Sequence, residues 1–279
     1  MTTTTWDAGR ASTTPLARLR HQAHVVRVIA GAEFKLKYSG SALGYVWSLI
    51  KPLGLFAMLY IVFGRFFKLT VGFKDYPLYL LIGIVLWTYF ADATTLTLSS
   101  LVNRATLIWK LSFPRILVPI STTVSVGITF LVNLVAVGAF VAAARVAPRP
   151  AWLLLPFLLI ELYLVTLGVG LVLATLFVRL RDIGQVWELA LQLLFYASPI
   201  IYPVGFLPPW AKPVAFLSPF VQVIQDTRAI VLPGPQSITA PDIYGTAWGE
   251  LLPLGVGAVV IAIGFALFRQ QSPWFAERL

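Results

Sequence analysis

Four carboxylates interrupt the long apolar stretches of this sequence, and they are the residues there most able to do chemistry. They are Asp92, Glu161, Glu188 and Glu250. Ionisable groups inside a membrane often mark proton relays, so Glu161, the deepest of the four, would suit a proton-coupled transporter. The same carboxyls could instead hydrogen-bond between helices or pair with an arginine. We favour this structural role because no second acid lies near Glu161 in sequence and no inverted repeat is visible.

Other reactive chemistry has little support in the sequence. The chain has no cysteine, and its two histidines, His21 and His24, lie in the polar N-terminal segment. These counts argue against thiolate ligands, cysteine nucleophiles and histidine-rich metal sites. The G-x-x-x-x-G-K-[ST] loop that cradles nucleotide phosphates is missing, as are zinc signatures and the G-x-S-x-G elbow. A membrane-bound enzyme is possible but has no visible catalytic set, and we expect no metal and no cofactor in this chain.

The composition points to a protein whose solvent is largely lipid. Hydrophobic residues make up 58% of the 279 positions, charged residues only 11%, and the mean hydropathy is +0.84. A soluble domain would carry about 25% charged residues. The net charge of +10 is more typical of loops facing anionic lipid than of nucleic-acid binding. We expect an all-α integral membrane protein that contacts membrane lipids and no nucleic acid.

Six stretches are apolar and long enough to cross a membrane, for which about 20 residues suffice. They cover residues 41–63, 76–98, 116–144, 151–178, 183–202 and 247–268. Fourteen of the 21 Lys and Arg residues flank these stretches on the same side as the N-terminus. Because cytoplasmic loops carry the excess of basic residues, we expect both ends of the chain in the cytoplasm.

The N-terminal segment is predicted to lie along the inner membrane surface. Leu16, Leu19, Ala23, Val26 and Ala30 recur at helical spacing, with basic residues on the other side, and no cleavable signal peptide is visible. Such a basic amphipathic helix suits the interface, although a soluble helix packed on a partner is the alternative. The predicted organisation is a cytoplasmic segment at 1–40, a six-span domain at 41–268 and a cytoplasmic tail at 269–279.

The segment between the fifth and sixth stretches is richer in proline and aromatic residues than a simple loop. Pro213 and Pro219 interrupt its helical periodicity. Ser218 directly before Pro219 is a favourable start for a new helix, with serine as its cap. We predict two short re-entrant helices within about residues 206–232, dipping into the outer leaflet and either buried in protein or lining a cavity.

Aromatic side chains fall in two groups on the first and fifth stretches. The groups are Phe56, Tyr60 and Phe63, and Phe195, Tyr196 and Tyr202. Lipid-facing packing and interfacial belts explain most membrane aromatics. The alternative is the wall of a conduit, because flat aromatic faces stack on sugar rings without selecting one sequence of linkages.

Two residues make the first stretch unusual. Lys51 and Pro52 lie within it. We expect Lys51, near the inner end, to snorkel to the headgroups, since a charge at mid-span would be costly. Pro52 is expected to kink the helix rather than end it.

Several stretches together resemble one family. They are LKYSGSALGYVWSLIKPL at 36–53, VFG at 62–64, FPR at 113–115, Arg-Asp at 181–182, SPIIYP at 198–203, and the spacing of Pro219 and Arg228. In this order, and over nearly the whole chain, they resemble the permease subunits of bacterial polysaccharide ABC exporters, which export O-antigen, teichoic acid, capsule or galactan. Ser218 stands where that family usually has asparagine, and the two residues cap a helix comparably.

The resemblance implies a homodimer in the bacterial plasma membrane, with two copies of a separate ATPase subunit that binds ATP and Mg. The inner loop at about 101–114 would be a coupling helix seated on that ATPase. Its contact residues would be Asn103, Arg104, Trp109, Lys110, Phe113, Pro114 and Arg115. The outer helices would form a gate that includes Pro199, Trp210, Pro219 and Arg228.

The resemblance also implies a substrate, namely a polysaccharide linked to a polyprenyl diphosphate and moved from the cytoplasm to the outer face. Basic residues near the inner entrance could attract the diphosphate. These are Arg18, Arg20, Arg27, Lys35 and Lys37. Each could equally anchor the segment to anionic lipid. The alternatives are a drug or small-lipid ABC exporter, a proton-coupled secondary transporter using Glu161, and a membrane-bound enzyme, which only its location favours.

Overall fold

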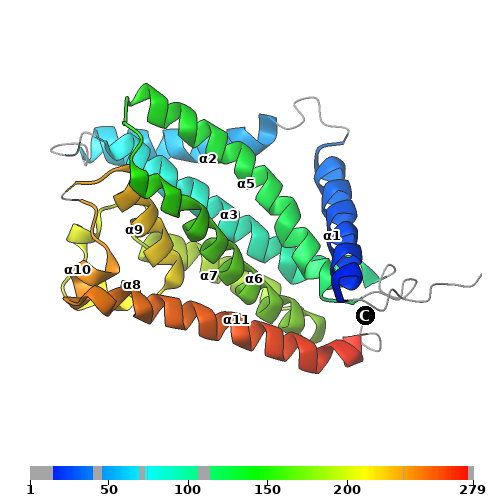
Figure 1. The fold of residues 1–279 in the computed structure, drawn as a ribbon. Coiled ribbons are helices and arrows are strands. Elements are labelled where there is room, and N and C mark those ends of the chain that lie inside the picture. Colours follow the sequence, from blue (N-terminus) through cyan, green and yellow to red (C-terminus); the bar gives the residue numbers. More distant parts are fainter. Residues whose placement is uncertain are drawn as a thin grey trace, which may run out of the picture.

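The computed structural model describes residues 15–39, 46–68, 73, 75–105, 114–234 and 236–275, and all regular structure within these ranges is helical (Figure 1). The described residues form eight longer helices and several short helical turns. The longer elements are α1 (Pro15–Tyr38), α2 (Val46–Leu59), α3 (Tyr76–Asn103), α5 (Leu117–Ala143), α6 (Leu155–Arg179), α7 (Ile183–Ala197), α9 (Pro219–Val231) and α11 (Leu251–Gln271). The shorter elements are η1 (Tyr60–Phe66), η2 (Pro150–Leu154), η3 (Val204–Phe206), α8 (Ala211–Phe216), α10 (Ala240–Tyr244), η4 (Ala247–Glu250) and η5 (Ser272–Trp274). The all-α class predicted from the sequence is confirmed.

Five helical segments in the described part of the chain are long and apolar enough to cross a membrane. They are Val46–Phe66, Tyr76–Asn103, Leu117–Ala143, Pro150–Arg179 and Ala247–Trp274. Each contains most of one predicted span. The first continues past Pro52, which is buried inside α2, into the π-helical turns of η1.

The expected fifth span, 183–202, is the exception, and its prediction as one continuous helix is wrong. Helix α7 has 15 residues and ends at Ala197. At 1.5 Å per residue it is about 22 Å long, less than the roughly 30 Å of a bilayer core. Ser198 is already extended, with ψ of 144°, because a residue before proline avoids the helical region. The predicted count of six full spans is therefore not confirmed.

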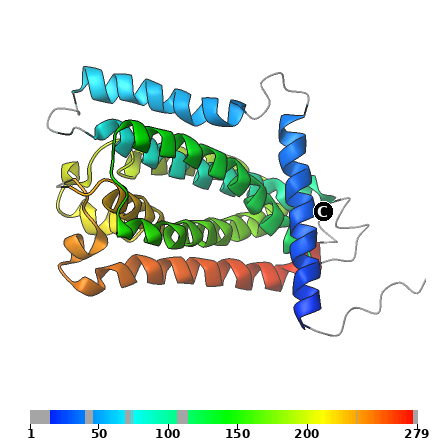
Figure 2. The same ribbon diagram turned by 45° about the horizontal axis from the view of Figure 1, so that its top comes forward.

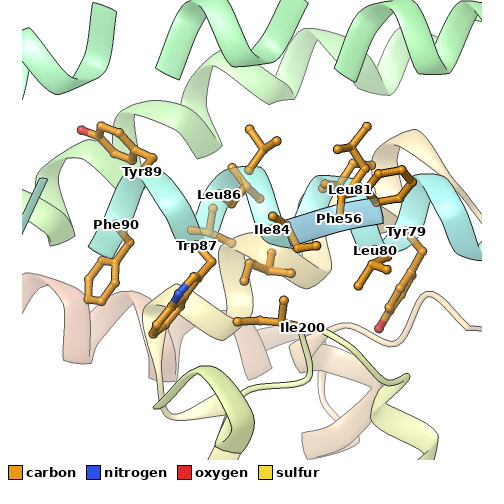
Figure 3. Close-up of a cluster of buried hydrophobic side chains, with 14 of the residues drawn as sticks. Phe56, Tyr79, Leu80, Leu81, Ile84, Leu86, Trp87, Tyr89, Phe90 and Ile200 are labelled. Carbon is orange, nitrogen blue, oxygen red and sulfur yellow. The ribbon is translucent and has the colours of Figure 1, made fainter. Parts of the chain in front are cut away.

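Helix α3 is the centre of the fold. It packs against α5, α6, α7, α9 and α2, and most of its residues are buried. Its sequence is apolar on all sides, which is the pattern of a helix enclosed by others. Figure 3 shows its side chains, among them Leu80, Ile84 and Trp87, in the main hydrophobic cluster with Ile200 from the segment after α7. This central helix holds the elements around it in position.

Helices α6 and α11 approach each other through two glycines. A Cβ built on Gly264 would lie 2.4 Å from the carbonyl oxygen of Gly168, and one on Gly168 would lie 2.9 Å from Cα of Ile261. Small residues of this kind let membrane helices pack with their backbones in contact. The contact joins the last long helix to the centre of the bundle.

Helix α1 runs crosswise to the long helices at one end of the bundle (Figures 1 and 2). It packs against α5, and the end of α11 lies at the same end of the molecule (Figure 2). Of the five apolar residues predicted on one face, Ala30 is buried, whereas Leu16 and Leu19 are 71% and 61% exposed. The crosswise course agrees with a helix lying along a membrane surface, which stays a prediction.

The outer segment contains two short helices within the predicted range of 206–232, namely α8 and α9. Helix α9 begins where the Ser218-Pro219 pair predicted it: Ser218 is the N-cap, and its Oγ accepts a hydrogen bond of 3.5 Å from the Val221 amide. Most of α9 is buried against α3, α6 and α11. Its role as a gate stays a prediction.

Candidate functional site

The segment after α7 is non-helical backbone buried in the protein. Four successive carbonyls, those of Pro199, Ile200, Ile201 and Tyr202, each accept a hydrogen bond from a side chain of another element. Ile200 and Ile201 are 0% and 2% exposed. Non-helical backbone at membrane depth is tolerated where protein groups satisfy its polar atoms, and this segment meets that condition. The side chains that satisfy it are therefore the ones that determine its shape.

Arg228 of α9 supplies the largest share of those hydrogen bonds. Its Nη1 donates to the Pro199 carbonyl and its Nη2 to the Ile200 carbonyl, both at 2.7 Å, while its Nε donates to the Tyr79 carbonyl at 3.1 Å. The side chain is completely buried. Its guanidinium carbon lies 3.4 Å from the centre of the Tyr79 ring, a cation–π contact. One arginine thus joins α9, α3 and the segment after α7.

Three other side chains complete the support of this segment. Gln225 donates to the Pro199 carbonyl at 3.3 Å, and the hydroxyl of Tyr76 donates to the Ile201 carbonyl at 3.0 Å. The Tyr79 hydroxyl donates to the Tyr202 carbonyl at 3.4 Å. Gln225 is one helical turn before Arg228, so both point to the same side of α9.

Gly83 makes room for the guanidinium of Arg228. A Cβ at this position would lie 2.3 Å from Arg228 Nη2 and 3.3 Å from Cγ2 of Ile200. No side chain fits there while the arginine keeps its hydrogen bonds. Of the predicted gate residues, Arg228 and Pro199 belong to this assembly and Pro219 is the first residue of α9, whereas Trp210 is 75% exposed.

The predicted aromatic residues of the first span lie mostly inside the chain. Phe56 is 8% exposed and packs edge-on to Phe140, with ring centres 5.5 Å apart, while Tyr60 stacks on Phe56 at 5.9 Å and on Tyr76 at 6.5 Å. Phe63 is half-buried and stacks on Phe67. These rings form a row that leads to α3.

The second aromatic group lies around the end of α7. Phe195 is buried against Trp87, with ring centres 5.5 Å apart, and Tyr196 beside it is 65% exposed. The Tyr202 hydroxyl donates to the carbonyls of Tyr196 and Ala197 and so closes the turn that follows α7. Only Tyr196 of the six predicted conduit residues presents an exposed ring, and a conduit role for the set stays a prediction.

The predicted entrance residues of α1 are arranged along its exposed surface. Arg20, Arg27, Lys35 and Lys37 are exposed, and the side chain of Arg18 lies outside the described residues. Lys37, near the end of α1, lines three polar cavities of about 320, 290 and 590 Å³ between α1 and the spans. It is the one predicted entrance residue that the structure places beside cavities in the described bundle.

Lys51 and Asp92 form an ion pair between two of these cavities. Lys51 Nζ lies 2.7 Å from Asp92 Oδ1, and both residues line the cavities of about 290 and 590 Å³. The Lys51 side chain is 68% exposed and that of Asp92 26%. The pair connects α2 to α3. The expectation that Lys51 simply snorkels to the headgroups missed this partner.

Arg104, a predicted coupling residue, pairs with Glu33 of α1. Glu33 Oε1 also accepts a hydrogen bond of 3.0 Å from the Thr122 hydroxyl of α5. Burial lowers the pKa of Arg104, and the adjacent carboxylate balances its charge. The pair joins α1, α5 and the end of α3, directly before the inner loop.

The remaining coupling residues have different positions. Arg115 donates through Nη1 to the Ser272 carbonyl after α11, which connects the far end of the inner loop to the C-terminal region. Asn103 donates to Ser99 Oγ at 3.1 Å, and Pro114 is exposed. Trp109, Lys110 and Phe113 lie outside the described residues.

The four carboxylates within the apolar stretches differ in their surroundings: one is paired, two are exposed and one is partly buried. Asp92 is paired, and Glu188 and Glu250 are exposed. Glu161 Oε1 is buried with no hydrogen-bond partner among the described residues, as is Asp226 Oδ1 on α9.

Sequence reasoning missed the residues that act through partners distant in the chain. Glu33, Tyr76, Tyr79, Gly83 and Gln225 belong to this group. Glu33 carried a signal, because it is the one acid between Asp7 and Asp75 and lies inside a basic helix. Nothing in the sequence marks Gly83 as the space for a guanidinium 145 residues away.

Comparison with known proteins agrees with this architecture. Residues 24–232 match the family described as ABC-2 type transporter. The chain is 29% identical over 255 residues to an O-antigen export system permease protein RfbA from Klebsiella pneumoniae, covering 90% of this chain and 93% of that protein. It is 26% identical over 178 residues to an RfbA from Myxococcus xanthus, covering 62% of this chain and 66% of that protein. It is 22% identical over 247 residues to the polysialic acid transport protein KpsM from Escherichia coli, covering 86% and 90%. The chain belongs to the ABC-2 type transporter family.

Proposed function

We propose that this chain is the membrane-spanning permease subunit of an ATP-driven polysaccharide exporter, and that its substrate is a polysaccharide linked to a polyprenyl diphosphate. The observation that carries the proposal is the similarity to O-antigen and polysialic acid export proteins over most of the chain. The substrate moves from the cytoplasm to the outer face of the bacterial plasma membrane. Both termini of the chain are cytoplasmic.

The energy source is a separate ATPase subunit, present in two copies. The sequence has no phosphate-binding loop of its own, so nucleotide and Mg bind to that partner. The inner loop between α3 and α5 contacts the ATPase. Its two ends are fixed by the Glu33–Arg104 pair and the Arg115–Ser272 contact, so a push on the loop would reach α1 and the end of α11.

The diphosphate enters beside Lys37, together with Arg18, Arg20, Arg27 and Lys35 of α1. Two cavities there share the Lys51–Asp92 pair, and hydroxyl and amide groups line one of them, including Thr88, Thr129 and Asn133. An ammonium group near a diphosphate supplies a charge-assisted hydrogen bond. The neighbouring hydroxyls suit a sugar.

A second copy of the chain completes the conduit. Val186, Leu189, Leu193 and Tyr196 of α7 recur on one helix face and are 60%, 57%, 63% and 65% exposed. An exposed row of this kind, on a helix as short as α7, fits contact with another protomer. Tyr196, whose ring is exposed, lines the path, and the other five aromatic residues support its wall from within the protein. Helices α8 and α9 with Arg228 form its outer gate.

Family membership disfavours the proton-coupled alternative, because ABC transporters are driven by ATP. A drug or small-lipid exporter of the ABC class would share the fold and differ in substrate. The test is to purify the chain with the ATPase encoded beside it and to measure ATP hydrolysis in lipid nanodiscs. Lipid-linked glycan should stimulate hydrolysis, and free polyprenyl phosphate or a cationic drug should not. Stimulation by the drug alone would contradict the proposed substrate.

A further inference from the structure

A strongly apolar cavity lies between α3, α5, α6 and α9. Its volume is about 450 Å³, and it is lined by α3, α5, α6 and α9, among them Leu86, Leu134, Gly138 and Leu159. The end of α5 and the start of α6 that form it lie at the end of the bundle opposite α1 (Figure 1). An engineered cavity of about 150 Å³ holds a benzene molecule, so this one has room for part of a lipid chain.

Two polar atoms of the lining are buried without a hydrogen-bond partner among the described residues. They are Nε1 of Trp152 and Oγ1 of Thr227, whose side chain is 7% exposed. Buried polar groups are normally satisfied, and an indole N–H can only donate. The cavity therefore suits a molecule that is apolar along most of its length and carries an acceptor oxygen near Trp152.

Two basic residues are adjacent in the chain to residues that line the cavity. Val146 and Pro148 line it, and Arg145 and Arg149 flank them in the same short loop. Both arginines are exposed, and neither forms an ion pair in the described part of the chain. Trp152 follows at the start of a predicted span, the depth at which tryptophan occurs at a membrane interface.

We propose that this cavity binds an anionic glycerophospholipid. One acyl chain fills the space between α5 and α6, an ester carbonyl accepts the hydrogen bond from Trp152, and the phosphate lies beside Arg145 and Arg149. A polyprenyl chain fits less well because it has no acceptor oxygen along its length. The site is distinct from the proposed entrance at the other end of the bundle and does not depend on the proposed function.

The lipid would also support the buried arginine. Thr227 and Val231 line the cavity from α9, and Thr227 is adjacent to Arg228 in the chain. An acyl chain occupying the cavity packs against Thr227 and Val231, which lie on either side of Arg228 in α9. Its occupancy thus holds the helix on which that segment depends.

Brominated lipids test the proposal because bromine quenches tryptophan fluorescence on contact. The protein is placed in phosphatidylcholine vesicles containing a small fraction of phosphatidylglycerol brominated on its acyl chains, and the contribution of Trp152 is taken as the difference from Trp152→Phe. We expect the fluorescence of Trp152 to be quenched at a low mole fraction of brominated phosphatidylglycerol. At that mole fraction, random contact with brominated lipid in the bulk bilayer is too rare to explain the quenching. Brominated phosphatidylcholine should require a mole fraction at least about fivefold higher, the effect expected of one basic residue near a lipid surface.

Two matched pairs of variants separate the site from general effects. Gly138→Leu should abolish the preferential quenching, whereas Gly127→Leu on the same helix should leave it, since a Cβ meets nothing within 4 Å at either glycine. The double substitution Arg145→Gln and Arg149→Gln should remove the preference for phosphatidylglycerol. The control double substitution, Arg65→Gln and Lys68→Gln, should leave this preference unchanged. Equal quenching by both lipids, or quenching that persists in folded Gly138→Leu protein, would overturn the proposal.

Discussion

The guanidinium of Arg228 lies against the ring of Tyr79, 3.4 Å from its centre, while its Nε donates to the Tyr79 backbone carbonyl. The two residues are 149 positions apart in the chain. Their contact fixes α9 to α3, and the other two guanidinium nitrogens fix the segment after α7 to both. A buried charge is costly unless it is fully hydrogen-bonded, so this arrangement depends on all its members.

Arg228→Lys should be far from conservative. Lysine has one ammonium in place of a planar fork, so at least one of the three carbonyls loses its donor. We expect a loss of about 2–4 kcal/mol of stability, together with loss of transport. Thermal unfolding in nanodiscs measures the first, with the exposed Arg181→Lys as a control expected to change stability by no more than about 0.5 kcal/mol. Equal stability of Arg228→Lys and wild type would contradict this role.

Gly83→Ala should act through the same arginine. The added Cβ would lie 2.3 Å from Arg228 Nη2, so the guanidinium must move. Overpacking of this kind costs about 1–3 kcal/mol. Gly127→Ala, with open space around it, should be neutral or stabilising by about 0.5–1 kcal/mol. Both are measured by unfolding, and a stable, active Gly83→Ala protein would show that the contact is dispensable.

Lys51→Glu should slow export more than it lowers the amount of folded protein. The change places two carboxylates side by side at the cavities, but an exposed pair contributes only about 0–1 kcal/mol to stability. The ratio of export to folded protein in the membrane is the measurement. Exchanging the charges, with Lys51→Asp and Asp92→Lys together, should recover part of the export. Equal losses of export and folded protein in Lys51→Glu would make the residue a topology anchor.

Glu33→Gln should loosen α1. It leaves the half-buried Arg104 without its counter-charge, which costs about 1–3 kcal/mol. Hydrogen exchange should become faster in α1 and at the end of α3, while Asp75→Asn, at the other end of α3, should leave both unchanged. Unaltered exchange in α1 would mean that packing against α5 alone holds this helix.

Glu161→Gln should keep most of the ATP-driven export. Its Oε1 is buried without a hydrogen-bond partner among the described residues, but the proposed mechanism moves no proton through this carboxyl. Export from proteoliposomes with and without a proton gradient provides the measurement. Abolished export in well-folded Glu161→Gln would revive the proton-coupled alternative.

Local sequence features predicted much of the fold. Apolar length located the five long spans, and the Ser218-Pro219 pair located the start of α9, because both signals depend on neighbouring residues. The prediction of the fifth span, 183–202, is wrong at its C-terminal end. Helix α7 ends at Ala197, before Pro199 and Pro203, although the residues that follow are apolar. The stretch is apolar in composition, so it was predicted to continue the span. Its prolines, however, restrict the backbone and prevent a continuous helix.

The candidate site was less predictable because its geometry is built from distant pairs. The resemblance predicts Arg228 as a gate residue, but it could not predict the hydrogen-bond partners, because these are backbone carbonyls, which every residue carries. Lys51 was read as a snorkelling side chain because Asp92 is 41 positions away. Contacts of this kind come from the packing of α2, α3 and α9 and have no signature along the chain.

Translocation of lipid-linked glycan in a defined system is the most direct test of the account. The chain and its ATPase are reconstituted in liposomes with a labelled polyprenyl-diphosphate-linked polysaccharide, and a membrane-impermeant lectin reports the glycan that has crossed. The account predicts lectin binding that requires ATP and both subunits and disappears with Arg228→Lys. Translocation without ATP, or by the chain alone under a proton gradient, would contradict it.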